Sequence, residues 1–271
     1  MRCSYGKSKK LVKPIAVFDA GIGSYAWARA IREKFPKQDI IYFADRANFP
    51  YAWKTKDELK ACIKGAIERL ADMGACLVVV TSNAPSITVV SEIKEECSVP
   101  VVGSIPPIAS GVATSKTGEI INLGVKILSS LPEFRFFVES ISDDAKVHLV
   151  NAEDLVTTVE SGQFITEHEK TVEQVKKFMD DVRQKYPNAD VCTLSSTHLT
   201  WIVDIFQKAA PDMQFINPVD RTLKKIEPYT SEGSGTTLSY ATSSEEYPLI
   251  GLQLMFDKLG IPIKLVEVPA I

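Results

Sequence analysis

The chain alternates short apolar runs with longer amphipathic stretches along most of its 271 residues. This alternation is typical of βαβ units, in which buried parallel strands are joined by helices that cover the sheet. The apolar runs predict strands at 14–18, 39–43, 77–81, 99–103, 120–125, 146–150, 191–194 and 214–216. The amphipathic stretches predict helices at 25–34, 56–73, 86–97, 167–185 and 245–259, the last of them stopped by Gly260. An α/β fold with mainly parallel sheets follows.

The predicted strands fit either one wide sheet or two sheets of four. Two features favour two domains: the step Ser104-Ile105-Pro106-Pro107, and a second αβ series that starts afresh after the polar residues 114–119. The Asn217-Pro218 step returns the chain toward the first domain, and the polar loop at 231–237 is expected to be exposed and mobile. We predict two pseudo-symmetric domains with a cleft between them, formed by residues 1–106 with 219–271 and by residues 107–218.

Composition excludes several classes of protein. The net charge of −3, from 31 basic and 34 acidic residues, gives no reason to expect nucleic acid or an anionic membrane as a partner. No apolar run approaches the ~18 residues of a membrane span, and residues 1–13 lack the apolar core of a signal peptide. Five cysteines with no CxxC pair argue against disulfides and a zinc site. We therefore expect a cytoplasmic protein without a metal.

Polar side chains follow several predicted strands at the edge where open parallel sheets bind ligands. Asp19 ends the first strand and Asp45 the second. The third strand is followed by Ser82-Asn83-Ala84, and the seventh by Ser195-Ser196-Thr197-His198. The third and seventh strands thus share a pattern of an apolar run, a serine and small polar residues that begin a helix. If the two halves face each other, these two strand ends flank a common cleft.

Each of these residues also has a structural interpretation. Ser82 and Ser196 could be helix N-caps, Asp19 could form a turn, and His198 could be a buried structural histidine. Residues 21–26 (GIGSYA) match the GxGxxA pattern of dinucleotide-binding turns, with Asp45 near the spacing of a ribose-binding acid. A carboxylate at Asp19 would repel the pyrophosphate, so a nucleotide site is disfavoured.

Several blocks, in consistent order, resemble the glutamate racemases of the aspartate/glutamate racemase superfamily. The segment 16–23 (AVFDAGIG) is similar to the opening turn of that family, and the segment 40–45 (IIYFAD) with Phe49-Pro50-Tyr51 is similar to its next block. Further similar segments are 78–86 (VVVTSNAPS), 99–107 (VPVVGSIPP), 159–162 (VESG) and 194–199 (LSSTHL).

The resemblance implies cofactor-independent racemisation of an amino acid, in amino-acid metabolism and cell wall biogenesis. In that family two thiols face opposite sides of the substrate α-carbon, and one takes the proton that the other returns. By position, Ser82 and Ser196 occupy the two thiol sites, Asp19 supports the first, and Glu160 and His198 support the second. The resemblance also suggests a homodimer. The residues expected to hold the substrate are Ala20, Pro50, Tyr51, Asn83, Ala84 and Thr197.

This sequence departs from the family pattern at the positions that carry the chemistry. Both thiols are replaced by serine, Ala20 stands for serine, and Val125 stands for a threonine that would bind substrate. A serine hydroxyl needs an adjacent base to act, so we expect impaired turnover. Two alternatives remain open: a divergent member acting on another small carboxylate as a decarboxylase, isomerase or hydrolase, and a non-catalytic ligand-binding paralogue.

Overall fold

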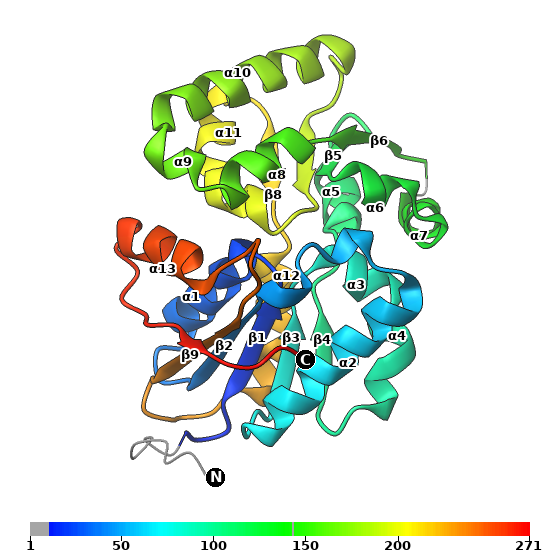
Figure 1. The fold of residues 1–271 in the computed structure, drawn as a ribbon. Helices are drawn as coiled ribbons and strands as arrows, with labels where there is room; N and C mark the ends of the chain where they lie inside the picture. The colour runs from blue at the N-terminus through cyan, green and yellow to red at the C-terminus, as the bar shows by residue number, and fades with distance from the viewer. Residues whose placement is uncertain (1–10, 143) are drawn as a thin grey trace, which may run out of the picture.

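A computed structural model describes residues 11–142 and 144–271, which form two parallel β-sheets with helices on both faces (Figure 1). The first sheet has the strand order β10-β9-β2-β1-β3-β4, and the second has the order β6-β5-β7-β8. The strands are β1 (Ile15–Asp19), β2 (Ile40–Asp45), β3 (Leu77–Val80), β4 (Val101–Gly103), β5 (Glu119–Gly124), β6 (Lys146–Asn151), β7 (Val191–Leu194), β8 (Gln214–Ile216), β9 (Thr237–Thr242) and β10 (Val266–Glu267).

The two sheets repeat one topology. The order β2-β1-β3-β4 in the first sheet matches β6-β5-β7-β8 in the second, so β3 and β7 hold equivalent places. The predicted α/β class, the parallel pairing and the two-sheet arrangement are confirmed. The sequence predictions missed β9 and β10, which extend the first sheet beyond β2. The domain limits 1–106 with 219–271 and 107–218 stay a prediction.

The helices begin and end close to the predicted positions where a single amphipathic stretch forms them. In α2 (Lys56–Asp72), the apolar residues at helical spacing, Leu59, Ile63, Ile67 and Leu70, are all buried. The helices are α1 (Tyr25–Lys34), α2 (Lys56–Asp72), α3 (Asn83–Thr88), α4 (Val90–Ile93), α5 (Ile108–Thr114), α6 (Lys126–Ser130), α7 (Pro132–Ser142), α8 (Glu153–Glu160), α9 (Gln163–Thr166), α10 (His168–Lys185), α11 (Val203–Ala209), α12 (Val219–Ile226) and α13 (Leu249–Lys258).

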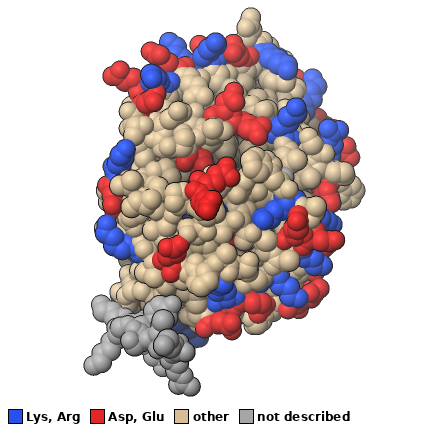
Figure 2. Space-filling view, in the orientation of Figure 1, with Lys and Arg blue, Asp and Glu red and all other residues tan. Residues whose placement is uncertain are grey.

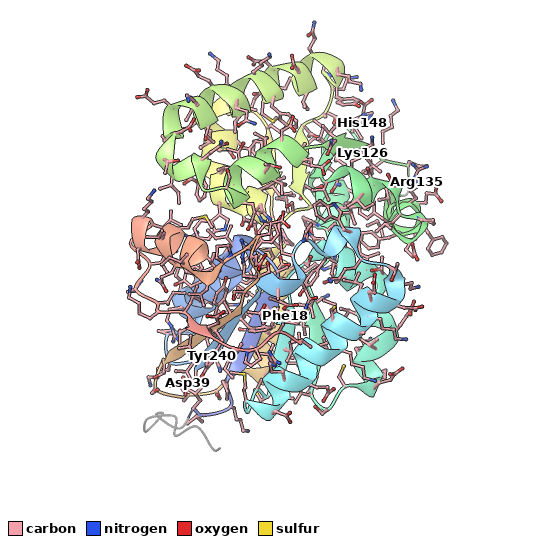
Figure 3. All side chains as sticks on the ribbon, in the orientation of Figure 1. Phe18, Asp39, Lys126, Arg135, His148 and Tyr240 are labelled. Atoms are coloured by element: carbon pink, nitrogen blue, oxygen red, sulfur yellow. The ribbon has the colours of Figure 1, made fainter. Side chains whose placement is uncertain are left out.

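Alternation along β1 divides the core of the first sheet. Ile15 and Val17 face α1, α12 and α13, whereas Ala16 and Phe18 face α2 and α4 (Figure 3 labels Phe18 at the centre of the sheet). The cluster around Ile15 and Val17 continues into the second sheet, where Ile121 of β5 contributes to it. Apolar packing therefore runs without a break from one sheet to the other, which fixes how their edges face each other.

One predicted helix is interrupted. The segment expected as a single helix at 86–97 forms α3, α4 and a 3₁₀ turn. Ser86 Oγ and Thr88 Oγ1 donate hydrogen bonds to the carbonyl oxygens of Ser82 and Ala84, which competes with regular helical bonding. Val89, with φ −119°, separates the two short helices.

The loop at 231–237, expected to be exposed and mobile, is partly exposed, and hydrogen bonds attach it to the body of the protein. Asp39 accepts hydrogen bonds from the Ser234 and Thr236 backbone N–H groups, at 3.1 and 2.8 Å, and from Ser234 Oγ. Asp39 is buried and lies at the end of the first sheet away from the second sheet (Figure 3). These bonds lower the pKa of Asp39 despite its burial, which acts in the opposite direction and is the largest single influence.

Candidate active site

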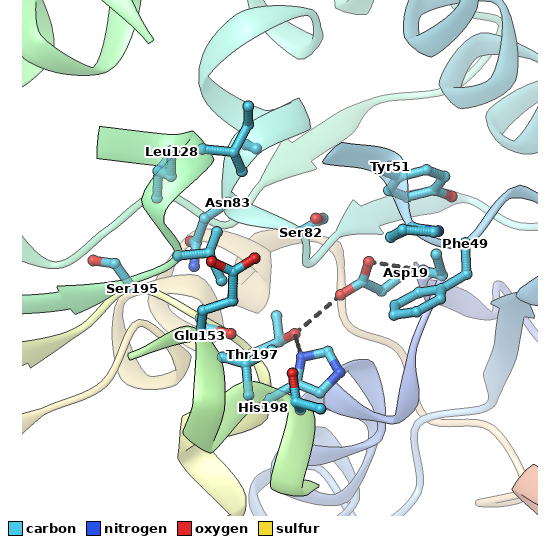
Figure 4. Close-up of a pocket in the computed structure, with 18 of the residues that line it drawn as sticks. Asp19, Phe49, Tyr51, Ser82, Asn83, Leu128, Glu153, Ser195, Thr197 and His198 are labelled. Atoms are coloured by element: carbon cyan, nitrogen blue, oxygen red, sulfur yellow. Dashed lines mark hydrogen bonds between the residues drawn. The ribbon is translucent and has the colours of Figure 1, made fainter. Parts of the chain in front are cut away.

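A cavity of about 270 Å³ lies between the carboxyl ends of β1 and β3 in the first sheet and of β7 in the second (Figure 4). Its polar lining comes from both halves, and an apolar wall is supplied by Val125, Leu128 and Val156. The expectation that the two equivalent strand ends flank one cleft is confirmed, since Ser82 and Ser196 both line it. The lining also contains Asp19, Ala20, Phe49, Pro50, Tyr51, Trp53, Asn83, Ala84, Ile127, Glu153, Thr157, Ser195, Thr197 and His198.

Asp19, at the end of β1, links the two halves through its carboxylate. Its Oδ1 accepts a hydrogen bond from the Ala20 N–H at 2.7 Å, and its Oδ2 accepts one from Thr197 Oγ1 at 3.1 Å. The side chain is nearly inaccessible to solvent. Burial raises the pKa of Asp19, although His198 and both hydrogen bonds act against the increase. The carboxyl group can therefore take up a proton more readily than an exposed aspartate.

The glycines after Asp19 allow the second half to approach closely, which accounts for the GxGxxA pattern without a nucleotide. A Cβ atom on Gly21 would lie 2.7 Å from Glu160 Oε2 and 2.9 Å from His198 Nε2. A Cβ atom on Gly23 would overlap the Thr197 side chain. Both glycines thus serve the packing between the β1 turn and the segment after β7.

We expect Gly23→Ala to lower the free energy of unfolding by about 1–3 kcal/mol, because the added methyl group meets Thr197 side-chain and backbone atoms. Urea unfolding followed by circular dichroism measures this loss. Gly251→Ala is the matched control, since no atom lies within 4 Å of its added Cβ on α13, and it should stabilise the helix by about 0.5–1 kcal/mol. If the two variants unfold at the same urea concentration, the β1 turn accommodates the added methyl group without a loss of stability.

The segment after β7 places its side chains in different directions. Ser195 Oγ donates a hydrogen bond to Asn122 Oδ1 on β5, and Thr193 Oγ1 binds the same oxygen at 2.9 Å. Ser195 is therefore held by the second sheet. Ser196 is 9% exposed, and neither its hydroxyl nor that of Ser82 has a hydrogen-bond partner among the described residues.

Glu160 lies behind His198 and not in the cavity wall. His198 Nε2 is 2.6 Å from Glu160 Oε2, which also accepts the Ile22 N–H at 3.3 Å. Arg46 forms an ion pair with the other carboxylate oxygen. Burial would raise the pKa of Glu160, but the hydrogen bond and charge of His198 together with the Arg46 guanidinium outweigh it, so the pKa is lowered. Glu160 is thus held as a carboxylate that orients His198.

Arg46, in the 3₁₀ turn η2 (Arg46–Asn48), joins this network to the loop over the cavity. Its guanidinium lies 5.2 Å from the ring centroids of both Phe49 and Tyr247. Its Nη1 also donates to the Ala20 carbonyl oxygen at 3.4 Å. The Phe49–Pro50 peptide bond is cis, and Tyr51 OH donates to Asp45 Oδ2 at 3.0 Å. These contacts fix the loop that carries Pro50 and Tyr51.

All the predicted site residues except Glu160 line the cavity. Sequence reasoning left out the contributions of Arg46, Glu153, Thr157 and the apolar wall. The position of Arg46 directly after a strand was the only signal for it. None of the cysteines lines the cavity in the described part of the chain, and Cys3 lies outside the described residues.

The electrostatic character of the cavity comes from acidic and neutral groups. Asp19 and Glu153 line it, and no lysine or arginine does so among residues 11–142 and 144–271. On the face shown in Figure 2, basic and acidic side chains are interspersed. An anionic group of a ligand would have to be bound by hydroxyl, amide and backbone donors. A cationic group would meet Asp19 or Glu153.

The described residues contain neither a membrane-spanning helix nor a cluster of metal ligands. No helix in the described ranges is long and apolar enough to cross a membrane. No cluster of three or more His, Cys, Asp or Glu side chains with metal-binding geometry occurs there either.

An α/β protein with two like sheets and a polar cavity between their carboxyl ends is of the class that binds small molecules in a cleft. The Asp/Glu/hydantoin racemase family matches residues 26–226. The chain belongs to this family.

Known relatives and structures agree with this assignment. A glutamate racemase of Bifidobacterium adolescentis is 24% identical over 82% of this chain and 90% of its own length. One from Persephonella marina is 27% identical over 91% and 97%. The crystal structure of a glutamate racemase isoform from Bacillus anthracis superposes with a TM-score of 0.79 at 20% identity, covering 94% of this chain and 97% of that one. The Escherichia coli glutamate racemase, in complex with L-glutamate and the activator UDP-MurNAc-Ala, gives 0.77 at 17% identity, covering 96% and 98%.

Proposed function

We propose that this chain is a cofactor-independent amino-acid racemase of the glutamate/aspartate type, with Ser82 and Ser196 at its two acid/base positions. The observation that carries the proposal is that equivalent ends of β3 and β7 place these hydroxyls in one cavity. Asp19 lies beside this cavity from the first half and His198 from the second. Family membership and the glutamate racemase relatives support the same reaction class.

The Asn83 side chain supports a small zwitterionic ligand. Its Nδ2 and Oδ1 atoms are both buried and have no hydrogen-bond partner in residues 11–142 and 144–271, although Asn83 lines the cavity. A buried amide without partners costs free energy of about 1–3 kcal/mol, which a bound ligand would recover. An amino acid offers a carboxylate to accept from Nδ2 and an ammonium group to donate to Oδ1. Asp19 and Glu153 add further attraction for the ammonium group.

We expect Asn83→Ala to weaken binding of glutamate or aspartate by about 5- to 150-fold, which corresponds to losing 1–3 kcal/mol of recovered hydrogen bonding. Its free energy of unfolding should not fall, because the substitution breaks no hydrogen bond among the described residues and removes a buried amide that has no partner there. Titration calorimetry and urea unfolding measure the two quantities.

Asn122→Ala is the matched control for Asn83→Ala. Asn122 is buried but accepts hydrogen bonds from Thr193 and Ser195. Its removal should cost about 1–3 kcal/mol of stability. If Asn83→Ala binds the amino acid as the parent chain does, Asn83 is not a ligand-binding group.

The chemistry proposed for this chain is slow. A serine that removes an α-proton must pass its own proton to a base, and within the described part of the chain neither serine hydroxyl is hydrogen-bonded to a base. The nitrogen atoms of His198 face Glu160 and Thr197, and the oxygen atoms of Asp19 face Ala20 and Thr197. Impaired turnover relative to a chain with thiols at these positions follows.

Deuterium exchange at the α-carbon tests the proposed function. D- and L-glutamate and aspartate are incubated in heavy water with this chain and with S82C/S196C, and the α-proton signal is followed by NMR. Exchange in the double variant supports a racemase site. If neither protein exchanges any of the four substrates, the racemase proposal fails.

The apolar wall favours a second candidate, a family member acting on another small carboxylate. Val125 and Leu128 present hydrocarbon to the cavity, where a dicarboxylic amino acid would need donors. Mass spectrometry of metabolites that copurify with the protein separates the two, since recovery of glutamate or aspartate contradicts this candidate. A homodimer and a cytoplasmic location stay predictions.

A further inference from the structure

A chain of hydrogen-bonding groups runs from the second half to the first beside the cavity. It consists of Glu160, His198, Thr197 and Asp19, and Figure 4 shows the contacts that Thr197 makes with His198 and Asp19. Thr197 Oγ1 lies 3.3 Å from His198 Nδ1 and 3.1 Å from Asp19 Oδ2. All members of the chain are largely buried, so its hydrogen atoms can be counted.

The surroundings of Glu160 require its side chain to be an ionised carboxylate. Its oxygens accept from the Ile22 N–H and pair with Arg46, and Oε2 lies 2.6 Å from His198 Nε2. A carboxylate without a proton only accepts, so Nε2 must carry a hydrogen atom. The open question is therefore the protonation of the other ring nitrogen, Nδ1.

Thr197 has one hydroxyl hydrogen but two partners. If it donates to Asp19, then Nδ1 must carry its own hydrogen and donate to Oγ1, which makes His198 an imidazolium beside an Asp19 carboxylate. If it donates to Nδ1, then Asp19 must be protonated and donate to Oγ1, and His198 is neutral. Compared with a neutral His198 beside an ionised Asp19, hydrogen bonds at both Thr197 contacts require one additional proton. That proton resides either on His198 or on Asp19.

We propose that Thr197 relays a single proton between His198 Nδ1 and Asp19 Oδ2, so that the groups supporting the two acid/base positions share it. In the transfer, Nδ1 gives its hydrogen to Oγ1 while the Oγ1 hydrogen passes to Oδ2. An imidazolium and a carboxylate become a neutral imidazole and a carboxylic acid. No atom is gained or lost, and the total charge is unchanged.

The use of the relay in catalysis rests on the proposed function. A two-base racemisation removes a proton on one side of the α-carbon and returns one on the other, so each turnover leaves the two sides in exchanged protonation states. Among the described residues neither serine hydroxyl is hydrogen-bonded to His198 or Asp19, so the relay exchanges a proton between these two supporting groups, without exchange with solvent, and does not itself connect the serines. The raised pKa of the buried Asp19 fits a carboxyl group that accepts this proton.

The surroundings contain other ionisable groups that must be considered in a titration. Glu160 and Arg46 are paired with each other, and Glu153 lies at the cavity wall. Tyr42 and Tyr51 are close enough to interact with Asp19, and Tyr247 with Arg46 and Glu160. The pKa values of these three tyrosines are raised, chiefly by burial, so their hydroxyl groups stay neutral through the acid and neutral pH range.

NMR titration of the full chain tests the relay without any turnover. The ¹⁵N chemical shifts of the imidazole nitrogens report the protonation of His198. The His198 signals are distinguished from those of His148 and His168 because they are absent from the spectrum of His198→Gln. His148 lies away from the cavity and serves as an internal reference (Figure 3). The ¹³C shift of the Asp19 carboxyl group, assigned by comparison with Asp19→Asn, is followed in the same samples.

In the parent chain and in Thr197→Ser, which keeps the hydroxyl, the two probes should follow one common titration curve. In Thr197→Val, which lacks the hydroxyl, the curves should separate by at least about one pH unit. Separate curves in the parent chain, or a common curve in Thr197→Val, would overturn the relay. Amide spectra establish that each variant is folded.

Asp19→Asn gives an independent result if Thr197→Val does not fold. The Ala20 N–H holds the amide oxygen on its side, so the amide nitrogen faces Thr197. That nitrogen donates to Thr197 Oγ1 and cannot take up the proton, so the hydroxyl hydrogen points at Nδ1. At the pH where Nδ1 is half-protonated in the parent chain, this variant should show an unprotonated Nδ1 and a protonated Nε2. Retention of the Nδ1 hydrogen in Asp19→Asn would refute the relay, whether or not the chain exchanges α-protons.

Discussion

S82C/S196C is expected to exchange the α-proton of its amino-acid substrate on the order of 10²–10⁴ times faster than the parent chain, the range that positioned acid/base groups contribute. A thiol with a pKa of about 8.5 is partly ionised near neutral pH, and helix N-termini or polar partners lower that value further. Ser82 directly precedes α3, and Ser196 precedes the 3₁₀ helix η5 (His198–Ile202), so both positions lie near such N-termini. The rate of deuterium incorporation measured by NMR gives the ratio.

The single variants make this expectation more specific. A thiol on one side of the α-carbon can remove the proton of only one enantiomer, so S82C and S196C should each exchange one enantiomer and not the same one. Neither should racemise its substrate at the rate of the double variant, because inversion needs a proton from the opposite side.

Ser195→Cys is the matched control for the thiol variants. Ser195 lines the same cavity and follows the same strand, but it is bound to Asn122. It should give no increase in exchange. If S82C/S196C is no faster than Ser195→Cys, then Ser82 and Ser196 are not the acid/base positions.

The parts of the fold that could be predicted are those specified by local pattern. The segment 191–194 is a strand as expected because it is a short apolar run, and α1 has the predicted ends. β9 was missed because Thr237–Thr242 mixes polar and apolar residues, and it becomes a strand by pairing with β2. The loop before it is fixed by Asp39, which is almost two hundred positions away in sequence. Long-range pairing of this kind leaves no local signal.

Some features of the candidate site could likewise be predicted from the sequence, whereas others depend on the folded arrangement. Strand topology places Asp19 and Ser82 at one edge of the first sheet and Ser196 at the equivalent edge of the second, and all three line the cavity. Glu160 lies behind His198 and does not line the cavity, and this placement depends on packing between the halves. Arg46 and Glu160 are 114 positions apart, and only the folded arrangement makes them a buried pair.

Arg46→Met is expected to lower the free energy of unfolding at pH 7 by about 3–5 kcal/mol, because it leaves the buried Glu160 carboxylate with one charged partner fewer. The Arg46 side chain is 6% exposed and that of Glu160 is 12% exposed, so solvent cannot replace the lost ion pair. Methionine keeps much of the apolar length, and it should retain part of the packing against Phe49 and Tyr247. Urea unfolding at pH 7 measures the loss.

The direction in which the free energy of unfolding depends on pH follows from the lowered pKa of Glu160. The folded-state pKa of Glu160 is lowered, so its stabilising contribution is present above the unfolded pKa of about 4.3 and is lost as pH falls through the folded value. Arg46→Met removes part of that lowering, so its stability should fall less steeply in this acid range than that of the parent chain. Unfolding free energies measured between pH 7 and pH 3 test the difference in slope.

Arg183→Met is the matched control, because Arg183 pairs with Asp212 at the surface with 39% and 64% of the two side chains exposed. An exposed pair of this kind contributes about 0–1 kcal/mol. A double-mutant cycle with Glu160→Gln separates the pairing energy from the cost of leaving a charge unpaired, and Arg46→Met/Glu160→Gln should recover part of the stability lost by Arg46→Met alone. If Arg46→Met costs no more than Arg183→Met, then Glu160 does not depend on Arg46 for its charge, and His198 is oriented by the remaining contacts of that carboxylate.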